Sequence, residues 1–382
     1  MTDASTVPHR RILTLVIALI LYGSLYPWEF HARHYGHSPL WMLLHAWPSA
    51  IDRYVLWDIG VNITLYLPLG LFAYLAVSPR AARGWRVLAP VALGLVLSAS
   101  IEMLQLFDDS RFCSLSDVAS NVTGAVVGVA VGAFYRVRLQ RFLAEHGAAS
   151  LLRPSGALLL LASWAGYQIF PLFPAWGRTH LMSRLAALQA QPAMPAVSTL
   201  VVFAEWLAVA CLLESIRKTR TTGLLALLLL LLPLRLIVVS RTLTWPDIEG
   251  AAAAFAIWAC LPRTWVRRAA PFVLTGALIL GELAPFHFQS ARTFSWVPFR
   301  GLFRSAWEDG FVILFRKSFW YGSVIWLWRA SGLSLAWMTV VTAAALFVLE
   351  RVQVYLPGRT PEITDAVLAV LMGVLLWLLR DA

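Results

Sequence analysis

The chain has 382 residues, of which 59% are hydrophobic and only 13% are charged, and its mean hydropathy is +0.71. So few polar residues cannot cover a water-soluble fold, so the composition excludes a soluble globular protein and predicts an integral membrane protein. A net charge of +11 would suggest nucleic acid as the partner of a soluble protein, but the placement of the basic residues has another explanation.

Apolar runs long enough to cross a bilayer recur along the whole chain. None of them alternates in the manner of a barrel strand, so we expect an all-α, polytopic membrane protein with about twelve transmembrane helices. The expected spans lie near residues 11 to 27, 55 to 77, 87 to 107, 117 to 135, 155 to 172, 197 to 213, 222 to 240, 247 to 261, 269 to 285, 309 to 328, 332 to 350 and 363 to 379.

Basic residues gather in every second connection between these expected spans, for example at Arg80, Arg83 and Arg86, whereas most acidic residues fall in the other connections. The positive-inside rule places the basic connections in the cytoplasm. We therefore expect a multi-pass membrane protein with both termini in the cytoplasm. The basic residues then have a topological role, and no nucleic-acid partner is expected.

Cysteine and histidine spacing predicts no metal site and no cofactor. The three Cys residues cannot form a disulfide framework, and neither a Cys-x-x-Cys pair nor a Cys/His ligand spacing occurs. His31, His34 and His37 stand three apart in the first outer segment and could bind a metal, but we interpret them as ordinary interfacial residues.

A sixteen-residue pattern occurs three times, at residues 102–117, 232–247 and 350–365, with no insertion or deletion within any copy. In each copy an Arg stands six residues before an Asp, and two copies also begin with Glu-x-x-Gln, which chance does not readily produce. Each copy ends a group of four expected spans. The sequence therefore predicts three parallel repeats of four helices, at residues 1–150, 151–268 and 269–382, with one common orientation because four is an even number.

Helix geometry suggests how the pattern is arranged. The Glu and the Gln share one helix face, and the Asp lies in the first turn of the next helix, where free N–H groups and the positive dipole end favour a carboxylate. The Arg between them can fold back over both carboxylates. Two roles remain open for it: it fastens the connection across two helix ends, or it takes part in a ligand site.

Further polar residues lie at the same expected membrane face as the pattern. We expect Glu350 to be the partner of Arg316 and Lys317, and Glu205 with Arg235 to replace the pair that the middle copy lacks. Glycines 124, 128 and 132 are spaced for close helix packing, and we assign them that role. The candidate ligand-binding residues are Asp58, Asn62, Glu102, Gln105, Arg111, Asp117 and Asn121 in the first repeat, and Lys317, Glu350, Gln353, Arg359 and Asp365 in the third.

At these residues the chain resembles the VanZ-like family of bacterial membrane proteins. The matching stretches are Trp57-Asp58-Ile59-Gly60-Val61-Asn62, Leu67-Pro68-Leu69-Gly70, Ser100-Ile101-Glu102-Met103-Leu104-Gln105, Arg111 and Ser116-Asp117-Val118, with a second copy through Lys317, Gly322, Glu350, Gln353, Arg359 and Asp365. The family's named member is associated with low-level teicoplanin resistance, and relatives occur near exopolysaccharide genes. The resemblance implies a protein of the bacterial inner (cytoplasmic) membrane with a role in the cell envelope and with envelope-biosynthesis proteins as partners. It implies no particular reaction.

Three functional hypotheses follow. We favour a non-enzymatic envelope protein whose outward-facing polar cavity binds the head group of a lipid-linked sugar or peptidoglycan precursor, with Arg111 and Arg359 contacting phosphate or carboxylate. The first alternative is an enzyme acting on such a lipid at the outer leaflet, with Glu102 as general base and Arg111 as electrostatic clamp. The second is a lipid transporter or scramblase, because parallel repeats occur in that class. The partner in each case is a membrane lipid or a lipid-linked glycan precursor.

Overall fold

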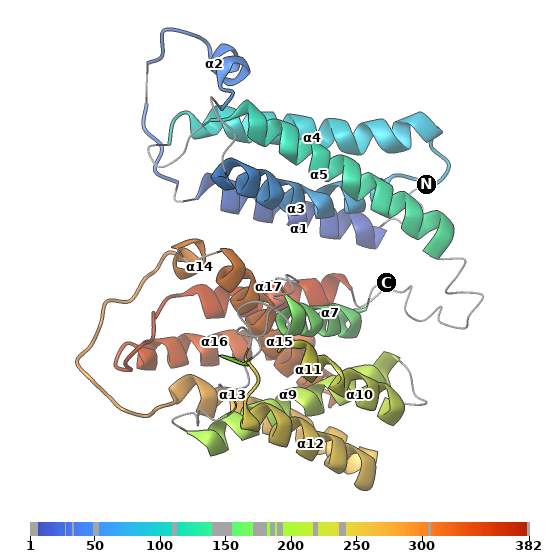
Figure 1. Ribbon diagram of the computed structural model, residues 1–382, viewed down its shortest axis with the longest axis vertical. Helices are drawn as coiled ribbons and strands as arrows, with labels where there is room; N and C mark the ends of the chain where they lie inside the picture. The colour runs from blue at the N-terminus through green and yellow to red at the C-terminus, as the bar shows by residue number, and fades with distance from the viewer. Residues whose placement is uncertain are drawn as a thin grey trace. The chain divides into compact units, whose positions relative to one another are not determined.

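The computed structural model describes residues 7–26, 28–32, 34–48, 53–108, 113–139, 155–170, 182–183, 188, 194–216, 221–236, 242–304 and 307–379. This part of the chain is helical and contains no strand, which confirms the predicted all-α class (Figure 1). The chain divides into two compact units. Unit 1 is Met1–Leu152 with Asp381–Ala382, and unit 2 is Arg153–Arg380.

Within its described residues, unit 1 has four long helices and one short one. The long helices are α1 (Val7–Leu25), α3 (Arg53–Ala76), α4 (Arg83–Gln105) and α5 (Leu115–Phe134), and a π-helical turn, Tyr135–Leu139, continues α5. They lie where the first four spans were expected. The short helix α2 (Pro39–His45) starts where the Ser38 hydroxyl accepts the Trp41 N–H, with Pro39 in the first turn.

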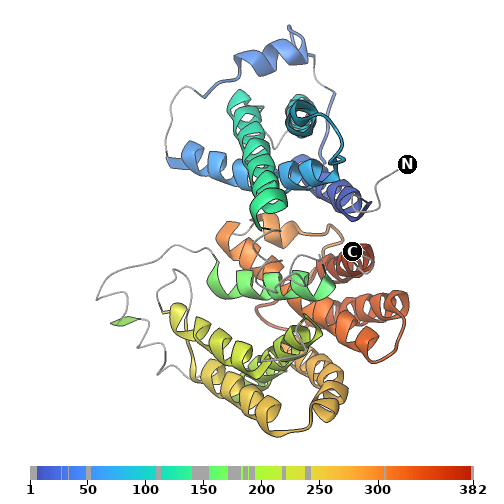
Figure 2. The same cartoon turned by 90° about the vertical axis from the view of Figure 1, so that its right-hand side faces the viewer.

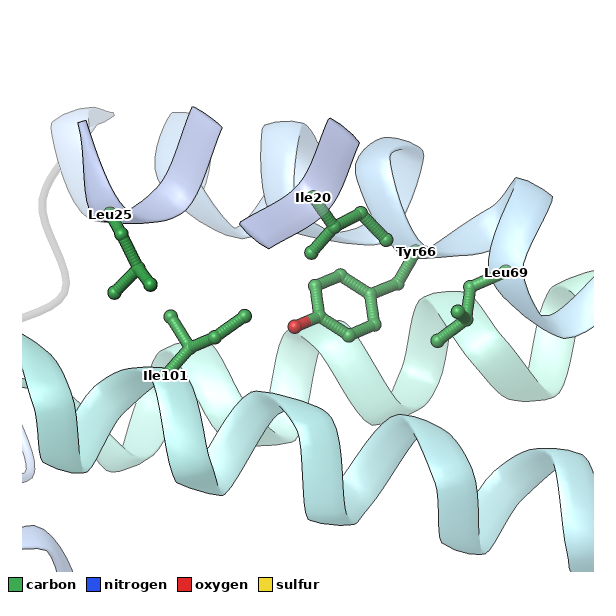
Figure 3. Close-up of a cluster of buried hydrophobic side chains, with 5 residues drawn as sticks. All are labelled: Ile20, Leu25, Tyr66, Leu69 and Ile101. Carbon is green, nitrogen blue, oxygen red and sulfur yellow. The ribbon is translucent and has the colours of Figure 1, made fainter. Parts of the chain in front are cut away.

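The core of unit 1 forms where α1, α3 and α4 meet (Figure 3). Ile20 and Leu25 of α1 point toward Tyr66 and Leu69 of α3 and toward Ile101 of α4, and all five are buried. These contacts hold the last turns of α1 and α4 together. That placement matters because the end of α4 carries the first copy of the sixteen-residue pattern.

Close backbone contact joins α3 to α5, and Figure 2 shows α5 lying across α3. A Cβ on Gly124 would overlap the backbone of Ile63, and one on Gly128 would overlap the backbone of Leu67. At these two positions only a hydrogen allows the backbones to approach so closely. The predicted packing role of these glycines is confirmed.

Unit 2 is larger and holds both the second and the third predicted repeats in one compact body. The predicted boundary between them, after residue 268, lies inside a helix. The helices are α7 (Gly156–Ile169), α9 (Pro195–Ile216), α10 (Thr221–Leu229), α11 (Leu231–Leu234), α12 (Trp245–Cys260), α13 (Arg263–Leu283), α14 (Arg300–Arg304), α15 (Trp307–Ala330), α16 (Leu335–Gln353) and α17 (Thr364–Leu378).

Five of the described helices are long and apolar enough to cross a membrane: α3, α4, α5 with its π-helical turn, α9 and α16. The helices α7 and α17, and the stretch Thr221–Pro233 formed by α10 and α11, are apolar but shorter. At about 1.5 Å per residue, fifteen residues reach about 22 Å, less than the roughly 30 Å of a hydrocarbon core. The structure therefore supports a membrane protein, and the number of twelve spans stays a prediction.

Replacing Gly124 by Ala should lower stability by about 1–3 kcal/mol, because the added methyl group would force α3 and α5 apart. The matched control is Gly60→Ala on α3, where nothing lies within 4 Å of an added Cβ and the substitution should be neutral or stabilising by up to about 1 kcal/mol. Thermal unfolding of the purified protein in detergent measures both. Equal melting temperatures for the two variants would contradict the packing role.

Candidate functional site

The glutamate of the pattern is buried in both copies that have it, and it binds the same backbone position each time. Glu102 Oε2 accepts the Ser114 N–H at 2.8 Å, and Glu350 Oε2 accepts the Glu362 N–H at 2.9 Å. Each donor stands twelve residues after its glutamate. The carboxylate thus fastens the end of one helix to the chain that leads into the next one.

The glutamine of the pattern reaches the first helix of its group. Gln105 Nε2 donates to the Ser24 carbonyl at 2.7 Å, and Gln353 Nε2 donates to the Glu282 carbonyl at 3.0 Å. Ser24 and Glu282 are each the second-last residue of their helices, α1 and α13. A helix end leaves its last carbonyls without intrahelical partners, and the glutamine satisfies one of them.

The segments that follow α1 and α13 repeat this arrangement in their backbone contacts. The His31 N–H donates to the Phe107 carbonyl, and the Gln289 N–H donates to the Tyr355 carbonyl, both at 2.7 Å. Phe107 and Tyr355 hold equivalent places, two residues after Gln105 and Gln353. The first and third copies of the pattern therefore have the same local structure, although one lies in unit 1 and the other in unit 2.

The aspartate of each copy lies in the first turn of a helix, as predicted. Asp117 lies in the first turn of α5, Asp247 in that of α12 and Asp365 in that of α17. In the middle copy the Asp247 carboxylate also accepts the Thr244 N–H and hydroxyl, a capping arrangement that satisfies a free donor at the helix start. The position is explained by helix-end chemistry before any ligand is considered.

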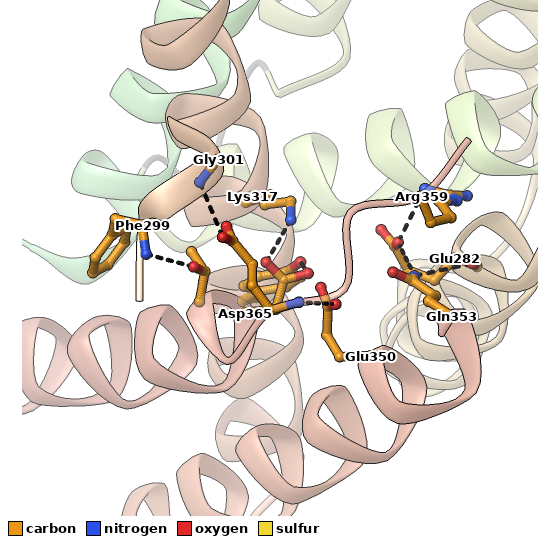
Figure 4. Close-up of polar contacts among 11 residues, drawn as sticks. Glu282, Phe299, Gly301, Lys317, Glu350, Gln353, Arg359 and Asp365 are labelled. Atoms are coloured by element: carbon orange, nitrogen blue, oxygen red, sulfur yellow. Dashed lines mark hydrogen bonds and ion pairs between the residues drawn. The ribbon is translucent and has the colours of Figure 1, made fainter. Parts of the chain in front are cut away.

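In the third copy the buried Asp365 has its cation on α15 (Figure 4). Lys317 Nζ lies 2.5 Å from Asp365 Oδ1, and the Tyr321 hydroxyl donates to Oδ2 at 2.6 Å. The Glu350 carboxyl lies beside Asp365. We expected Glu350 to be the ion partner of Lys317, and that prediction is wrong, because the carboxylate of Asp365 lies on the lysine and Glu350 Oε2 holds a backbone N–H instead.

The predicted fold of Arg359 over Glu350 and Asp365 is also wrong. Its guanidinium donates to the Gly281 carbonyl at 2.7 Å and the Ala284 carbonyl at 3.2 Å, and lies 3.4 Å from Glu282 Oε2 (Figure 4). The end of α13 concentrates carbonyl oxygens and the negative dipole end, so it attracts the guanidinium more directly than carboxylates that already have partners. Arg359 therefore acts as a fastener of the connection, one of the two roles left open.

The middle copy forms a different buried network. Arg235 lies 2.8 Å from Asp247 Oδ1 and donates to Gln168, which is the second-last residue of α7. Glu205 accepts from Gln168 Nε2 and from Trp164 Nε1, each at 2.8 Å. The expected direct pairing of Glu205 with Arg235 is corrected accordingly, because Gln168 lies between the two.

In the first copy some candidate residues are exposed and others are buried. Asp58 is exposed and lies beside Asp117 and Asn62. Asn121, one turn into α5, is buried and donates to the Ser98 hydroxyl of α4 at 2.9 Å. Asn121 thus joins two helices within the core of unit 1, while Asp58 stays accessible. Arg111, and Arg241 of the middle copy, lie outside the described residues.

A cavity of about 500 Å³ opens beside the third copy. Arg292, Arg300 and Arg359 line it together with Glu362, and Glu362 Oε2 accepts the Gly301 N–H at 3.0 Å. Arg292 and Arg300 are exposed and, within the described part of the chain, form no ion pair. No sequence pattern pointed to these two residues, because Arg292 lies between α13 and α14 and Arg300 begins α14, both outside the repeated pattern.

The geometry favours binding of an anion over acid–base chemistry. Three guanidinium groups and one carboxylate leave the lining positive, and guanidinium forks match phosphate and carboxylate oxygens. The carboxylates of Glu350 and Asp365 are buried behind this lining, each with partners of its own. Among the described residues, no group of His, Cys, Asp or Glu side chains could hold a metal ion.

Removing the Lys317 cation should destabilise the fold strongly, because it leaves the buried Asp365 carboxylate beside Glu350 without its partner. Breaking such a pair from one side costs about 3–5 kcal/mol. Lys317→Met should therefore lower the melting temperature sharply, whereas Lys317→Met with Asp365→Leu should recover most of the loss. The exposed Arg351→Met is the control. A single variant as stable as the wild type would refute this pairing.

The reactivity of the Cys113 thiol measures the negative charge of the first copy. Burial raises the pKa of this thiol to about 12, and the carboxylates of Glu102 and Asp117 also raise it. The thiolate is the reactive form, so alkylation at neutral pH should be slow. Glu102→Gln removes one neighbouring negative charge and should lower the pKa, which speeds alkylation severalfold.

The measurement is the pH dependence of iodoacetamide modification of Cys113, followed by mass spectrometry in a Cys260→Ala background. Glu29→Gln, an exposed carboxylate in the same unit, is the control and should leave the rate unchanged. If Glu102→Gln has no more effect than Glu29→Gln, the two side chains are not close enough to interact.

Comparison with known proteins agrees with this arrangement in the first copy. The family model described as VanZ/LLP1 matches residues 12–136, which hold α3, α4 and α5 and most of α1. No curated protein and no solved structure matches the chain. The resemblance inferred from the sequence is confirmed over these residues, and unit 1 is thus similar to the VanZ/LLP1 family.

Proposed function

We propose that the protein binds the anionic head group of a lipid-linked sugar or peptidoglycan precursor, without changing it chemically, in the cavity lined by Arg292, Arg300 and Arg359. The observation that carries the proposal is the excess of positive charge around a cavity of about 500 Å³. That volume lies within the roughly 300–1,000 Å³ of small-molecule sites. A phosphate or pyrophosphate fits the donor geometry of the arginines.

The surroundings of the cavity favour a ligand that comes from the membrane. Trp296 and Phe288, in the segment between α13 and α14, are 63% and 64% exposed. Exposed aromatic residues of this kind gather at the membrane–water boundary, where one side of the ring meets lipid. A polyprenyl chain could then lie along the membrane-facing surface while its phosphate reaches the arginines. Arg359 borders this cavity while its guanidinium holds the end of α13, and we propose that Arg111 contacts an anionic head group in the first copy.

Binding is favoured over catalysis because the acidic groups near the cavity are already engaged. Glu362 accepts a backbone N–H, and Asp365 has both a lysine and a tyrosine as partners. A general base must lie within hydrogen-bond reach of the substrate proton, and Asp365 does not line the cavity. Roles in glycopeptide resistance or in exopolysaccharide biosynthesis belong to this proposal as the settings in which such a head group would be met.

The test is binding of a polyprenyl-pyrophosphate-linked disaccharide peptide and of a polyprenyl-phosphate sugar to the purified protein in nanodiscs. Arg292→Ala with Arg300→Ala removes two exposed charges of the lining and should weaken binding at least tenfold, about 1.4 kcal/mol. Both side chains are exposed, so the fold should persist, which thermal unfolding verifies.

The matched control is Arg80→Ala with Arg83→Ala, which removes two exposed charges, one in the connection between α3 and α4 and one at the start of α4. It should bind both lipids as the wild type does. If the Arg292 and Arg300 double variant binds them with unchanged affinity, the proposal fails. If both double variants lose affinity equally, the effect is one of net charge and the assignment to this cavity fails as well.

A further inference from the structure

A second and larger cavity lies at the other end of unit 2. It measures about 650 Å³ and forms where the last turns of α9 and α15 meet the first turns of α13. The 21 residues of α13 begin beside this cavity and end at the carbonyls that hold Arg359. At about 1.5 Å per residue the helix is roughly 30 Å long, close to the thickness of a hydrocarbon core.

One wall of this cavity is cationic. Arg267 and Arg268 of α13 line it, and both are exposed. The acidic residue in the lining is Glu214, which lies 3.6 Å from Arg263 and 3.8 Å from Arg267. The separation from Arg267 is longer than a hydrogen bond, so Glu214 attracts this guanidinium group and leaves its N–H donors available to a ligand. The positive charge exceeds the negative charge.

The opposite wall is apolar. Trp326 and Leu327 of α15 line it, and large apolar side chains continue outside the cavity along α13, where Trp265 is 69% exposed and Phe272 is 65% exposed. An exposed Trp beside arginines is typical of the boundary between lipid and water. A cavity with one cationic and one apolar wall matches a molecule that carries an anionic group on a hydrocarbon chain.

Membrane topology accounts for some of these arginines but not for their placement. The positive-inside rule requires basic residues in a connection, and it is indifferent to where the side chains point. Here Arg267 and Arg268 lie one to two turns inside α13, and both border the same large cavity. A hollow of this volume lies within the range of ligand sites, about 300–1,000 Å³.

We propose that this cavity, lined by Arg267, Arg268 and Trp326, binds the phosphate of an anionic phospholipid at the membrane surface opposite to the sixteen-residue pattern. The guanidinium groups hold the phosphate, and the apolar wall formed by Trp326 and Leu327 receives the glycerol backbone and the first methylenes of the acyl chains. This site is separate from the one proposed for the lipid-linked precursor and does not depend on it.

The test is native mass spectrometry and titration of the purified full chain with short-chain phosphatidylglycerol, short-chain phosphatidylcholine, glycerol phosphate and inorganic phosphate. We expect phosphatidylglycerol to bind more tightly than phosphatidylcholine, because the choline cation meets a positive wall. Arg267→Ala with Arg268→Ala should weaken phosphatidylglycerol binding at least tenfold. Arg268→Ala alone keeps both contacts of Glu214 and should weaken it severalfold without loss of stability.

The control is the double variant Arg80→Ala with Arg83→Ala, which removes the same charge away from both cavities and should bind phosphatidylglycerol as the wild type does. Unchanged phosphatidylglycerol affinity in both Arg268 variants would overturn the proposal. Glycerol phosphate or inorganic phosphate binding as tightly as phosphatidylglycerol would also overturn it, because the ligand would then be a soluble phosphate. Failure at the precursor site leaves this result unaffected.

Discussion

Polar groups inside a helical membrane protein must find their partners within the protein, because lipid offers none. The Glu-x-x-Gln pair meets this requirement in two places, since the carboxylate binds a backbone N–H and the carboxamide binds a helix-end carbonyl. The pair joins three segments that are far apart in the sequence: the end of one helix, the connection that follows, and the end of the first helix in the group. These two contacts help to place the segments that follow α1 and α13.

The same requirement separates the charges that build the fold from those that remain for a ligand. Lys317 is engaged with Asp365, Arg235 with Asp247, and Arg359 with the end of α13. Four exposed arginines of unit 2 border two cavities, Arg267 and Arg268 near the start of α13, and Arg292 and Arg300 near its end. The exposed arginines of these cavities can therefore be replaced without unfolding the protein. Binding and stability can then be measured separately.

The sequence was sufficient where local periodicity decides the structure. The spacing of Glu102 and Gln105 placed both on one buried face, helix-end chemistry placed Asp117 and Asp365 in first turns, and the small glycines predicted the close approach of α3 and α5. It failed where the partner is a backbone carbonyl or a residue on a distant helix. The pairings of Lys317 and Arg359 are of this kind, because several carboxylates at similar depth compete for each cation.

The cavities lay beyond sequence reasoning for another reason. Arg292 and Arg300 stand outside every repeated pattern, and Arg267 and Arg268 read as topological signals. Only the folded chain brings each pair to the border of a hollow.

The most direct test of the account is a structure of the protein in nanodiscs determined with the pyrophosphate-linked disaccharide peptide bound. We predict density for the pyrophosphate within hydrogen-bond distance of Arg292 and Arg300. Glu350 should still accept the Glu362 N–H, and Arg359 should still donate to the carbonyls at the end of α13. Density for the head group at any other place, or an Arg359 turned onto Glu350 and Asp365, would contradict it.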